Sequence, residues 1–177
     1  MIVEKTNING LLIIKQKNNK DNRGKLRETF NDKILKKKFI FEYCTTSKKN
    51  VLRGFHFQTK FKQSKYVNVL KGKILDVVID LRKNSKTFGR IFRIILSSTN
   101  AKGLYIPAGF AHAYYSYEKE NIIYYKLDNY YTPKYESGII YNDTDLGIKW
   151  PMKKILISKK DRKLLSFKNF CNKYTGL

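Results

Sequence analysis

Short runs of β-branched and aromatic residues recur along nearly the whole chain, and each run is bounded by Gly, Asn, Asp or Lys. Such runs predict strands, and almost no helical periodicity separates them. Many short strands at even spacing indicate a β-sandwich or a barrel. The predicted strands cover residues 11–15, 39–44, 51–57, 66–70, 73–80, 91–96, 113–117 and 122–127.

The segments between these strands predict one tight turn and two helices. Lys71-Gly72 joins two of the runs and is typical of a two-residue hairpin turn. Helices are expected near 31–38 and over 159–173. In the second helix four residues would share one apolar face: Leu164, Phe167, Phe170 and Cys171. The chain has no internal linker, repeat or low-complexity tract, so we expect a single domain over residues 1–177.

Length and composition place the chain among soluble globular proteins. Its 177 residues, 42% of them hydrophobic, are enough to bury a substantial core. No apolar run is long enough to span a bilayer, and the charged N-terminus does not have the form of a signal peptide. Cys44 and Cys171 lack the paired spacing of a zinc site or a disulfide framework. We therefore expect a cytoplasmic protein with no membrane partner.

The formal net charge of +23 is a feature shared with nucleic-acid-binding proteins. The excess is mostly lysine, it is spread along the whole chain, and its longest uninterrupted run is residues 36–38. Arginine, which contacts bases and phosphates better, is scarce. We therefore predict no nucleic-acid partner and expect the positive field to gather an anionic substrate.

The chain has only two histidines, and both lie in strand contexts. His56 lies in VLRGFHFQ and His112 in IPAGFAH; a lone histidine of this kind is more often structural than catalytic. Arg53 precedes His56 by three positions, and strict alternation places such residues on opposite faces of a strand. Both side chains reach one site only if a bulge or twist intervenes, and Gly54 between them permits a bend.

Five segments that carry a combined pattern occur in this order: VLRGFHFQ (51–58), VVIDLRKNSKTFG (77–89), IPAGFAHAY (106–114), YYKLDNYYTP (124–133) and YNDTDLGIKWP (141–151). Together they resemble the dTDP-4-dehydrorhamnose 3,5-epimerase family, over about residues 21–161. The resemblance implies a mainly β fold, a double-stranded β-helix (cupin jelly roll) with a short C-terminal helix. It also implies a homodimer whose N-terminal strands are exchanged with the partner.

The resemblance implies neither a bound metal nor a cofactor. Metal-binding cupins usually offer an HxH pair, a nearby carboxylate and a later histidine. Here His56 is followed by Phe57 and Gln58, so the second ligand of the pair is missing, and two distant histidines are a poor ligand set. Related sugar 3,4-ketoisomerases share the fold but tend to carry a second histidine where this chain has Phe57.

Carried over position by position, the resemblance places a catalytic base at His56, its carboxylate partner at Asp161 and a general acid at Tyr125. Contacts to the substrate fall on six further residues: Arg23, Glu28, Arg53, Lys65, His112 and Tyr131. The implied substrate is a nucleotide-diphosphate sugar, with dTDP-4-dehydro-6-deoxyglucose as the leading choice and dTDP-4-dehydrorhamnose as its product. That product would enter a rhamnose-type unit of a surface polysaccharide.

Two regions depart from the family pattern. Phe41 and Tyr43 stand where the family usually has Gln and Asn. Lys25, Leu26 and Arg27 replace a customary aromatic residue. Both regions belong to the nucleotide and sugar contacts, so altered substrate selectivity is expected before altered chemistry.

These residue types suit inversion at a carbon beside a ketone. The reaction needs a base on one face of the sugar ring, an acid on the other and positive charge near O4. Neutral imidazole suits the base at neutral pH, and a carboxylate partner orients it. A tyrosine returns the proton from the opposite face, while Lys65 and Arg53 offset the charges of the oxyanion and the diphosphate.

Each assignment also has a simpler alternative. Ser158 and Asp161 have the spacing of a helix-capping box, Tyr125 would be a core residue by spacing alone, and Lys65 is one of many lysines. Tyr131 would simply close a strand. Two rival functions stay open: an epimerase that acts only at C3 or on another nucleotide-linked sugar, and a non-catalytic cupin that binds sugar nucleotides.

Overall fold

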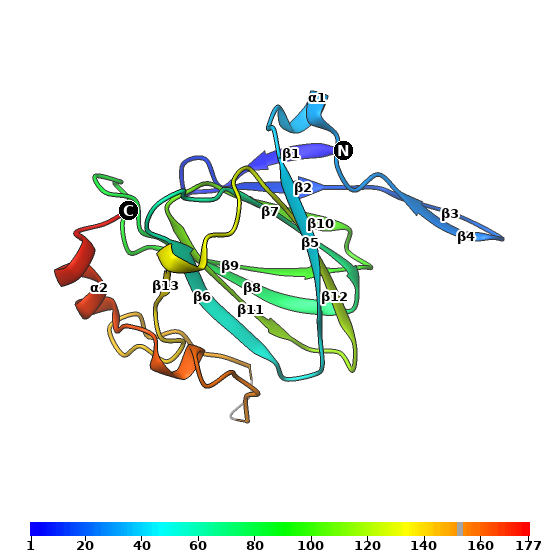
Figure 1. The fold of residues 1–177 in the computed structure, drawn as a ribbon. Coiled ribbons are helices and arrows are strands. Elements are labelled where there is room, and N and C mark those ends of the chain that lie inside the picture. The colour runs from blue at the N-terminus through cyan, green and yellow to red at the C-terminus, as the bar shows by residue number, and fades with distance from the viewer. Residues whose placement is uncertain (152–153) are drawn as a thin grey trace.

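Two antiparallel sheets face each other and form the body of the molecule (Figure 1). The computed structural model describes residues 1–151 and 154–177. The six-stranded sheet contains, in spatial order, β1 (Ile2–Lys5), β2 (Leu12–Lys15), β10 (Lys102–Ile106), β7 (Lys65–Lys71), β12 (Asn121–Leu127) and β5 (Phe41–Ser47). The five-stranded sheet contains β13 (Glu136–Gly138), β6 (Leu52–Gln58), β11 (Phe110–Ser116), β8 (Lys73–Asp80) and β9 (Ile91–Ser97). The predicted mainly β jelly roll is confirmed.

The main core lies between the two sheets, and the alternation of side chains along each strand explains it. Along β12 buried and half-buried residues alternate, so Ile123, Tyr125 and Leu127 point inward. Val78 and Tyr114 from the facing sheet join the same apolar cluster. Because successive side chains point to opposite faces of a strand, Tyr125 is held inside the body by strand geometry alone.

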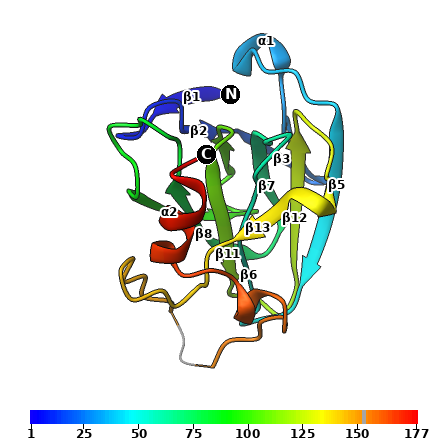
Figure 2. The same cartoon turned by 60° about the vertical axis from the view of Figure 1, so that its left-hand side comes forward.

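The C-terminal segment covers the outer face of the five-stranded sheet (Figure 2). Helix α2 (Phe167–Tyr174) begins after Ser166, whose hydroxyl accepts a hydrogen bond from the backbone N–H of Asn169. Phe170 of this helix packs against Phe57 with ring centroids 5.3 Å apart. Every residue of β11 is buried because the segment closes its second face.

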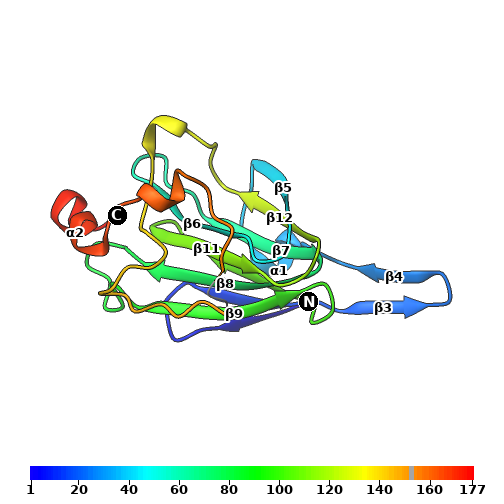
Figure 3. The same cartoon turned by 90° about the horizontal axis from the view of Figure 1, so that it is seen from below.

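A two-stranded arm projects from the body near the N-terminus (Figure 3). Its strands, β3 (Asn18–Asp21) and β4 (Gly24–Arg27), pair with each other and are largely exposed. The short helix α1 (Asp32–Leu35) follows within the predicted 31–38 segment, and Leu35 is buried in a small cluster with Tyr66 and Tyr105. The sequence runs predicted neither strand of the arm.

The eight predicted runs all overlap strands, but the predicted hairpin at Lys71-Gly72 is wrong. Strand β7 ends at Lys71 and β8 begins at Lys73, yet the two strands lie in different sheets. Gly72 has φ of +84°, and a Cβ there would lie 2.6 Å from the carbonyl oxygen of Glu120. Glycine therefore allows a sharp crossover between the sheets, and turn residues alone do not reveal which strands pair.

The predicted helix over 159–173 is confirmed only in its second half. Asp161–Lys163 forms a single 3₁₀ turn, and Leu165 then makes a β-bridge with Ile139. This bridge interrupts the helical pattern, so α2 starts only at Phe167. No helix in the described part of the chain is long and apolar enough to cross a membrane.

Candidate active site

His56 borders a cavity of about 470 Å³ between β6 and residues 156–161. Its Nε2 lies 2.9 Å from Oδ1 of Asp161, and Oδ2 of Asp161 accepts a hydrogen bond of 3.1 Å from the backbone N–H of Gly54. Burial raises the pKa of Asp161, but the hydrogen bond and charge of His56 outweigh it and leave this pKa below its usual value. With Nε2 bound to the carboxylate, Nδ1 is the ring nitrogen left for a ligand.

The capping alternative for Asp161 accounts for only one of its contacts. Its backbone N–H donates to Oγ of Ser158 at 3.0 Å, as a cap requires. Both carboxylate oxygens instead bond to β6, at Gly54 and His56. The side chain of Asp161 is only 5% exposed. Its carboxylate is therefore directed at the imidazole rather than at a helix end.

A β-bulge brings Arg53 and His56 to the same face of β6. His56 pairs with His112 of β11, and Arg53 pairs with Tyr114. Between these two pairs β6 advances by three residues while β11 advances by two, which is the mark of a bulge. Gly54 lies in the bulge with φ of +114°, and a Cβ there would lie 2.5 Å from the carbonyl oxygen of His112. The bulge that the spacing of these residues requires is present, and only glycine fits it.

A second pair of histidine and carboxylate lies beside the first. His112 lies opposite His56 in the strand register, and its Nε2 is 2.9 Å from Oδ2 of Asp76. Asp76 is fully buried, and its Oδ1 has no hydrogen-bond partner among the described residues. Although two histidines and two carboxylates meet here, no three metal-ligating side chains in residues 1–151 and 154–177 are grouped to hold a metal ion.

Tyr125 comes from the facing sheet and contacts His112. It is 3% exposed, and its ring centroid lies 6.0 Å from that of His112 in an edge-on arrangement. Burial, helped by the nearby hydroxyls of Tyr114 and Tyr43, raises the pKa of Tyr125 well above its usual value. The phenol is therefore protonated at neutral pH and available as a proton donor.

Lys65, at the start of β7, differs from the many solvated lysines of this chain. Its side chain is half-buried, and this burial lowers its pKa to about 8, although Glu136 and Asp76 act in the opposite direction. Both carboxylates belong to the same site as the histidines. Partial burial beside these carboxylates therefore distinguishes Lys65 from the solvated lysines.

Tyr131 is joined to this group through Glu136 of β13. Its hydroxyl donates to Oε2 of Glu136 at 2.5 Å, and this bond, with burial, raises the pKa of Tyr131 to about 12. Burial raises the pKa of Glu136, but hydrogen bonds from Lys160 and Tyr131 and the charge of His56 lower it overall. Tyr131 thus takes part in the polar network around His56.

The family model for dTDP-4-dehydrorhamnose 3,5-epimerase matches residues 5–169. The chain belongs to this family. The dTDP-4-dehydrorhamnose 3,5-epimerase of Methanothermobacter thermautotrophicus is 42% identical over 166 residues, which cover 89% of this chain and 90% of that protein. The protein is therefore an epimerase, which is an isomerase.

Two solved structures of this epimerase family share the fold. The enzyme of Bacillus anthracis, with TDP and PPi bound, superposes with a TM-score of 0.90 at 35% identity, over 94% of this chain and 99% of that chain. The enzyme of Legionella pneumophila, in complex with dTDP-4-keto-L-rhamnose, superposes with a TM-score of 0.88 at 36% identity, over 92% and 90%. A jelly-roll epimerase fold is thus shared over nearly the whole chain.

Two residues expected from the 3,5-epimerase pattern do not join the others. Arg23 lies at the tip of the arm, 86% exposed, and binds Asp21 at 2.6 Å. Glu28 lies at the base of the arm and accepts a hydrogen bond of 2.7 Å from Asn31. Figure 3 shows the arm extending away from the body. Within one chain, therefore, neither residue reaches the His56 cavity.

Sequence reasoning assigned no role to three residues that the structure places beside the candidate site residues. The sequence contains a signal for Asp76, because an acidic residue there interrupts the apolar run of β8. Glu136 had none, because a short polar segment gives no strand pattern. Tyr43 was noted only as a departure, yet its ring stacks on that of Tyr125 with centroids 4.9 Å apart and planes at 21°.

Proposed function

We propose that the chain inverts C3 and C5 of dTDP-4-dehydro-6-deoxyglucose and forms dTDP-4-dehydrorhamnose. The observation that supports this most is that His56, bonded to Asp161, lies on one sheet and Tyr125 lies on the facing sheet. A sugar ring bound between the sheets meets a base on one face and an acid on the other, as inversion requires. The names of the relatives support the same substrate class.

The proposed reaction begins when Nδ1 of His56 removes the hydrogen beside the keto group as a proton. The C–H electron pair forms a carbon–carbon double bond, and the carbonyl pair moves onto O4 to give an enolate. Asp161 stabilises the imidazolium, and Lys65 stabilises the negative O4. Arg53, which lines the His56 cavity, offsets the diphosphate charge.

Tyr125 completes the inversion by giving its hydroxyl proton to the same carbon from the opposite face. The carbonyl re-forms as the enolate electrons return to that carbon. The tyrosinate then takes a proton from water and the imidazolium loses one to water, which restores both groups. The high pKa of Tyr125 and the low pKa of Asp161 keep each group in the protonation state that this cycle needs.

We also propose that the active assembly is a homodimer. The arm of β3 and β4 extends from the body, and Arg23 at its tip is almost fully exposed. In an exchanged dimer Arg23 and Glu28 would reach the nucleotide in the partner's site. We place this single-domain enzyme in the cytoplasm, where the free thiols of Cys44 and Cys171 would stay reduced.

The experiment that tests this function follows 4-keto sugar nucleotides in deuterated buffer by NMR. Wild-type protein is expected to exchange the hydrogens at C3 and C5 of the dTDP-linked substrate and to invert both centres. Exchange at C3 alone would identify a C3 epimerase. Nucleotide binding without any exchange would identify a non-catalytic cupin and would refute the proposal.

A further inference from the structure

An aromatic cavity of about 220 Å³ opens beside the proposed acid. Phe41, Tyr43, Gln63 and Tyr131 line it. Phe41 and Tyr43, called here the aromatic wall, have ring centroids 5.7 Å apart, and Tyr43 stacks in turn on Tyr125. The aromatic wall therefore continues the surface of the reacting centre outward along β5.

We propose that the aromatic wall binds the nucleobase of the substrate by stacking and accepts thymine and uracil about equally. This inference rests on the proposed function, which supplies a nucleotide-linked sugar. Of the parts of such a molecule, the hexose and ribose are saturated and hydroxylated, and the diphosphate is anionic. Only the base offers a flat π face that matches an aromatic lining.

The charges around the aromatic wall are consistent with this orientation. Arg53 lines the His56 cavity, and Lys65 lies near Glu136 and Asp76 in the same site. Lys65 is placed to offset the charge on O4, and Arg53 is suited to the diphosphate, which lies between the sugar and the base. The aromatic cavity has one amide, that of Gln63, and no charged group in its lining. An uncharged flat group is the part of the substrate that this lining suits.

Gln63 supplies the polar contact in the cavity, and its orientation is determined by a neighbour. Its Nε2 donates to the carbonyl oxygen of Asn129 at 3.0 Å. This bond leaves Oε1 of Gln63 available as an acceptor for a ring N–H. Thymine and uracil both carry such an N–H between their two carbonyl groups and differ only by a methyl group. Neither stacking nor this amide therefore distinguishes the two bases strongly.

The test compares binding of dTDP, UDP and inorganic pyrophosphate to the full-length protein by calorimetry. We expect the Kd values of wild-type protein for dTDP and UDP to agree within about tenfold, since stacking is tolerant of base identity. Phe41→Leu is expected to weaken both nucleotides by roughly 5- to 150-fold, the size of one base–aromatic contact, and to leave pyrophosphate binding unchanged.

Two further variants separate stacking from a folding defect. Phe41→Tyr keeps the ring, so it should bind both nucleotides as wild type does. Phe88→Leu makes the same type of change at an exposed phenylalanine outside the cavity and should have no effect on binding. The inference would be overturned by dTDP binding that Phe41→Leu leaves unaltered, by equal weakening of pyrophosphate binding, or by a preference for dTDP over UDP of more than about tenfold.

The result of this binding test does not depend on whether the protein is catalytically active. If Phe41→Leu weakens both nucleotides but wild-type protein exchanges no hydrogen of any 4-keto sugar, stacking stands and the proposed function fails. If wild-type protein epimerises and Phe41→Leu binds normally, the function stands and stacking fails.

Discussion

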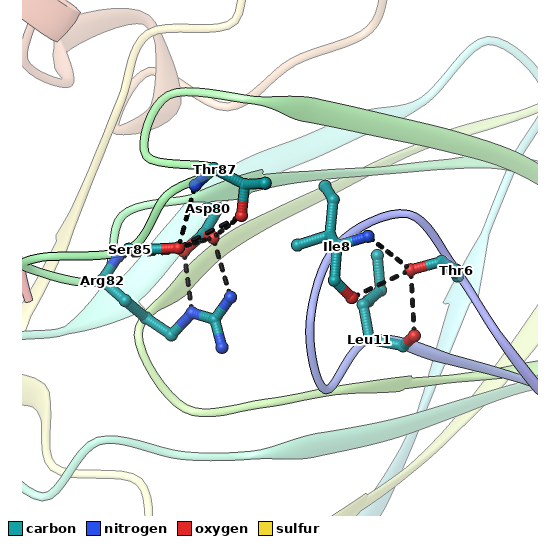
Figure 4. Close-up of polar contacts among 7 residues, drawn as sticks. All are labelled: Thr6, Ile8, Leu11, Asp80, Arg82, Ser85 and Thr87. Atoms are coloured by element: carbon teal, nitrogen blue, oxygen red, sulfur yellow. Dashed lines mark hydrogen bonds and ion pairs between the residues drawn. The ribbon is translucent and has the colours of Figure 1, made fainter.

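Asp80 and Asp161 are both buried carboxylates with lowered pKa values, but their partners differ in kind. Asp80 lies at the end of β8, fully buried, and its partners all come from the loop that follows (Figure 4). Hydrogen bonds outweigh burial and lower its pKa to about 2. The donors are Nε of Arg82 at 2.8 Å, Oγ of Ser85 at 2.7 Å and Oγ1 of Thr87 at 2.6 Å.

Asp161 binds groups that are far away in the sequence. Gly54 and His56 precede it by 107 and 105 residues. The guanidinium and hydroxyl partners of Asp80 do not titrate near neutral pH, so that carboxylate can only hold a loop in place. The partner of Asp161 is instead an imidazole, the side-chain type that is suited to proton transfer near neutral pH. The comparison teaches that the partner, rather than burial, separates a stabilising carboxylate from one that assists proton transfer.

The largest effect is expected from His56→Ala, which removes the proposed base and leaves the Asp80 loop intact. Exchange and inversion should both fall by roughly 10²- to 10⁴-fold, because no enolate forms without the base. Single-turnover NMR in deuterated buffer measures both rates. Rapid exchange by this variant would show that another group removes the proton.

Asp161→Asn should have a smaller effect on turnover. A hydrogen bond to a charged group contributes about 1.5–3 kcal/mol, which corresponds to a loss in kcat of roughly 10- to 150-fold. Ser158→Ala is the matched control, since it removes only the bond to the backbone N–H of Asp161. If both variants lose stability alike and keep full kcat, Asp161 is only a structural residue.

Asp80→Asn should do the opposite, lowering stability while kcat is retained. The pKa of Asp80 falls from 3.8 to about 2 on folding, which corresponds to about 2 kcal/mol and a Tm lower by roughly 4–8 °C. A carboxyl whose pKa is depressed in the folded state stabilises the fold at pH values above its pKa in the unfolded chain. The difference in stability between wild-type protein and Asp80→Asn should therefore shrink as the pH falls from about 4 towards 2. A Tm unchanged at neutral pH would contradict this reading.

The smallest effect concerns the pH profile of Lys65. Its pKa of about 8 predicts that kcat/KM declines as the pH rises through about 8, by up to tenfold per unit, because the lysine loses its charge. Lys65→Arg keeps the charge, so its profile should lack this limb. If kcat/KM of Lys65→Arg declines over the same pH range as that of wild type, the decline belongs to another group.

Much of the fold was predictable from local pattern, and the failures share a cause. The strands that form the core show their apolar runs in the sequence. The arm escaped prediction because the residues of β3 and β4 are polar and are held by pairing with each other. The hairpin at Lys71-Gly72 and the early start of the last helix failed because sheet membership and the bridge of Leu165 depend on distant residues.

The structure brings His56, His112 and Tyr125 together, although Tyr125 would be a core residue by spacing alone and was singled out only by the resemblance. Asp161 needed the resemblance, since its local signal indicated a cap. Glu136 stayed hidden because Lys160 and His56, which are distant in the sequence, come near it only in the folded chain, where β13 pairs with β6. Long-range contacts of this kind leave no periodic trace in a single sequence.

The central claim, that His56 and Tyr125 act on opposite faces of the sugar, is tested most directly by Tyr125→Phe. The variant keeps the base and Lys65, so it should still form the enolate. Its proton should then return from His56 on the original face. NMR of the dTDP-linked 4-keto sugar in deuterated buffer is predicted to show deuterium incorporation with retained configuration. Inversion at the wild-type rate would contradict the account.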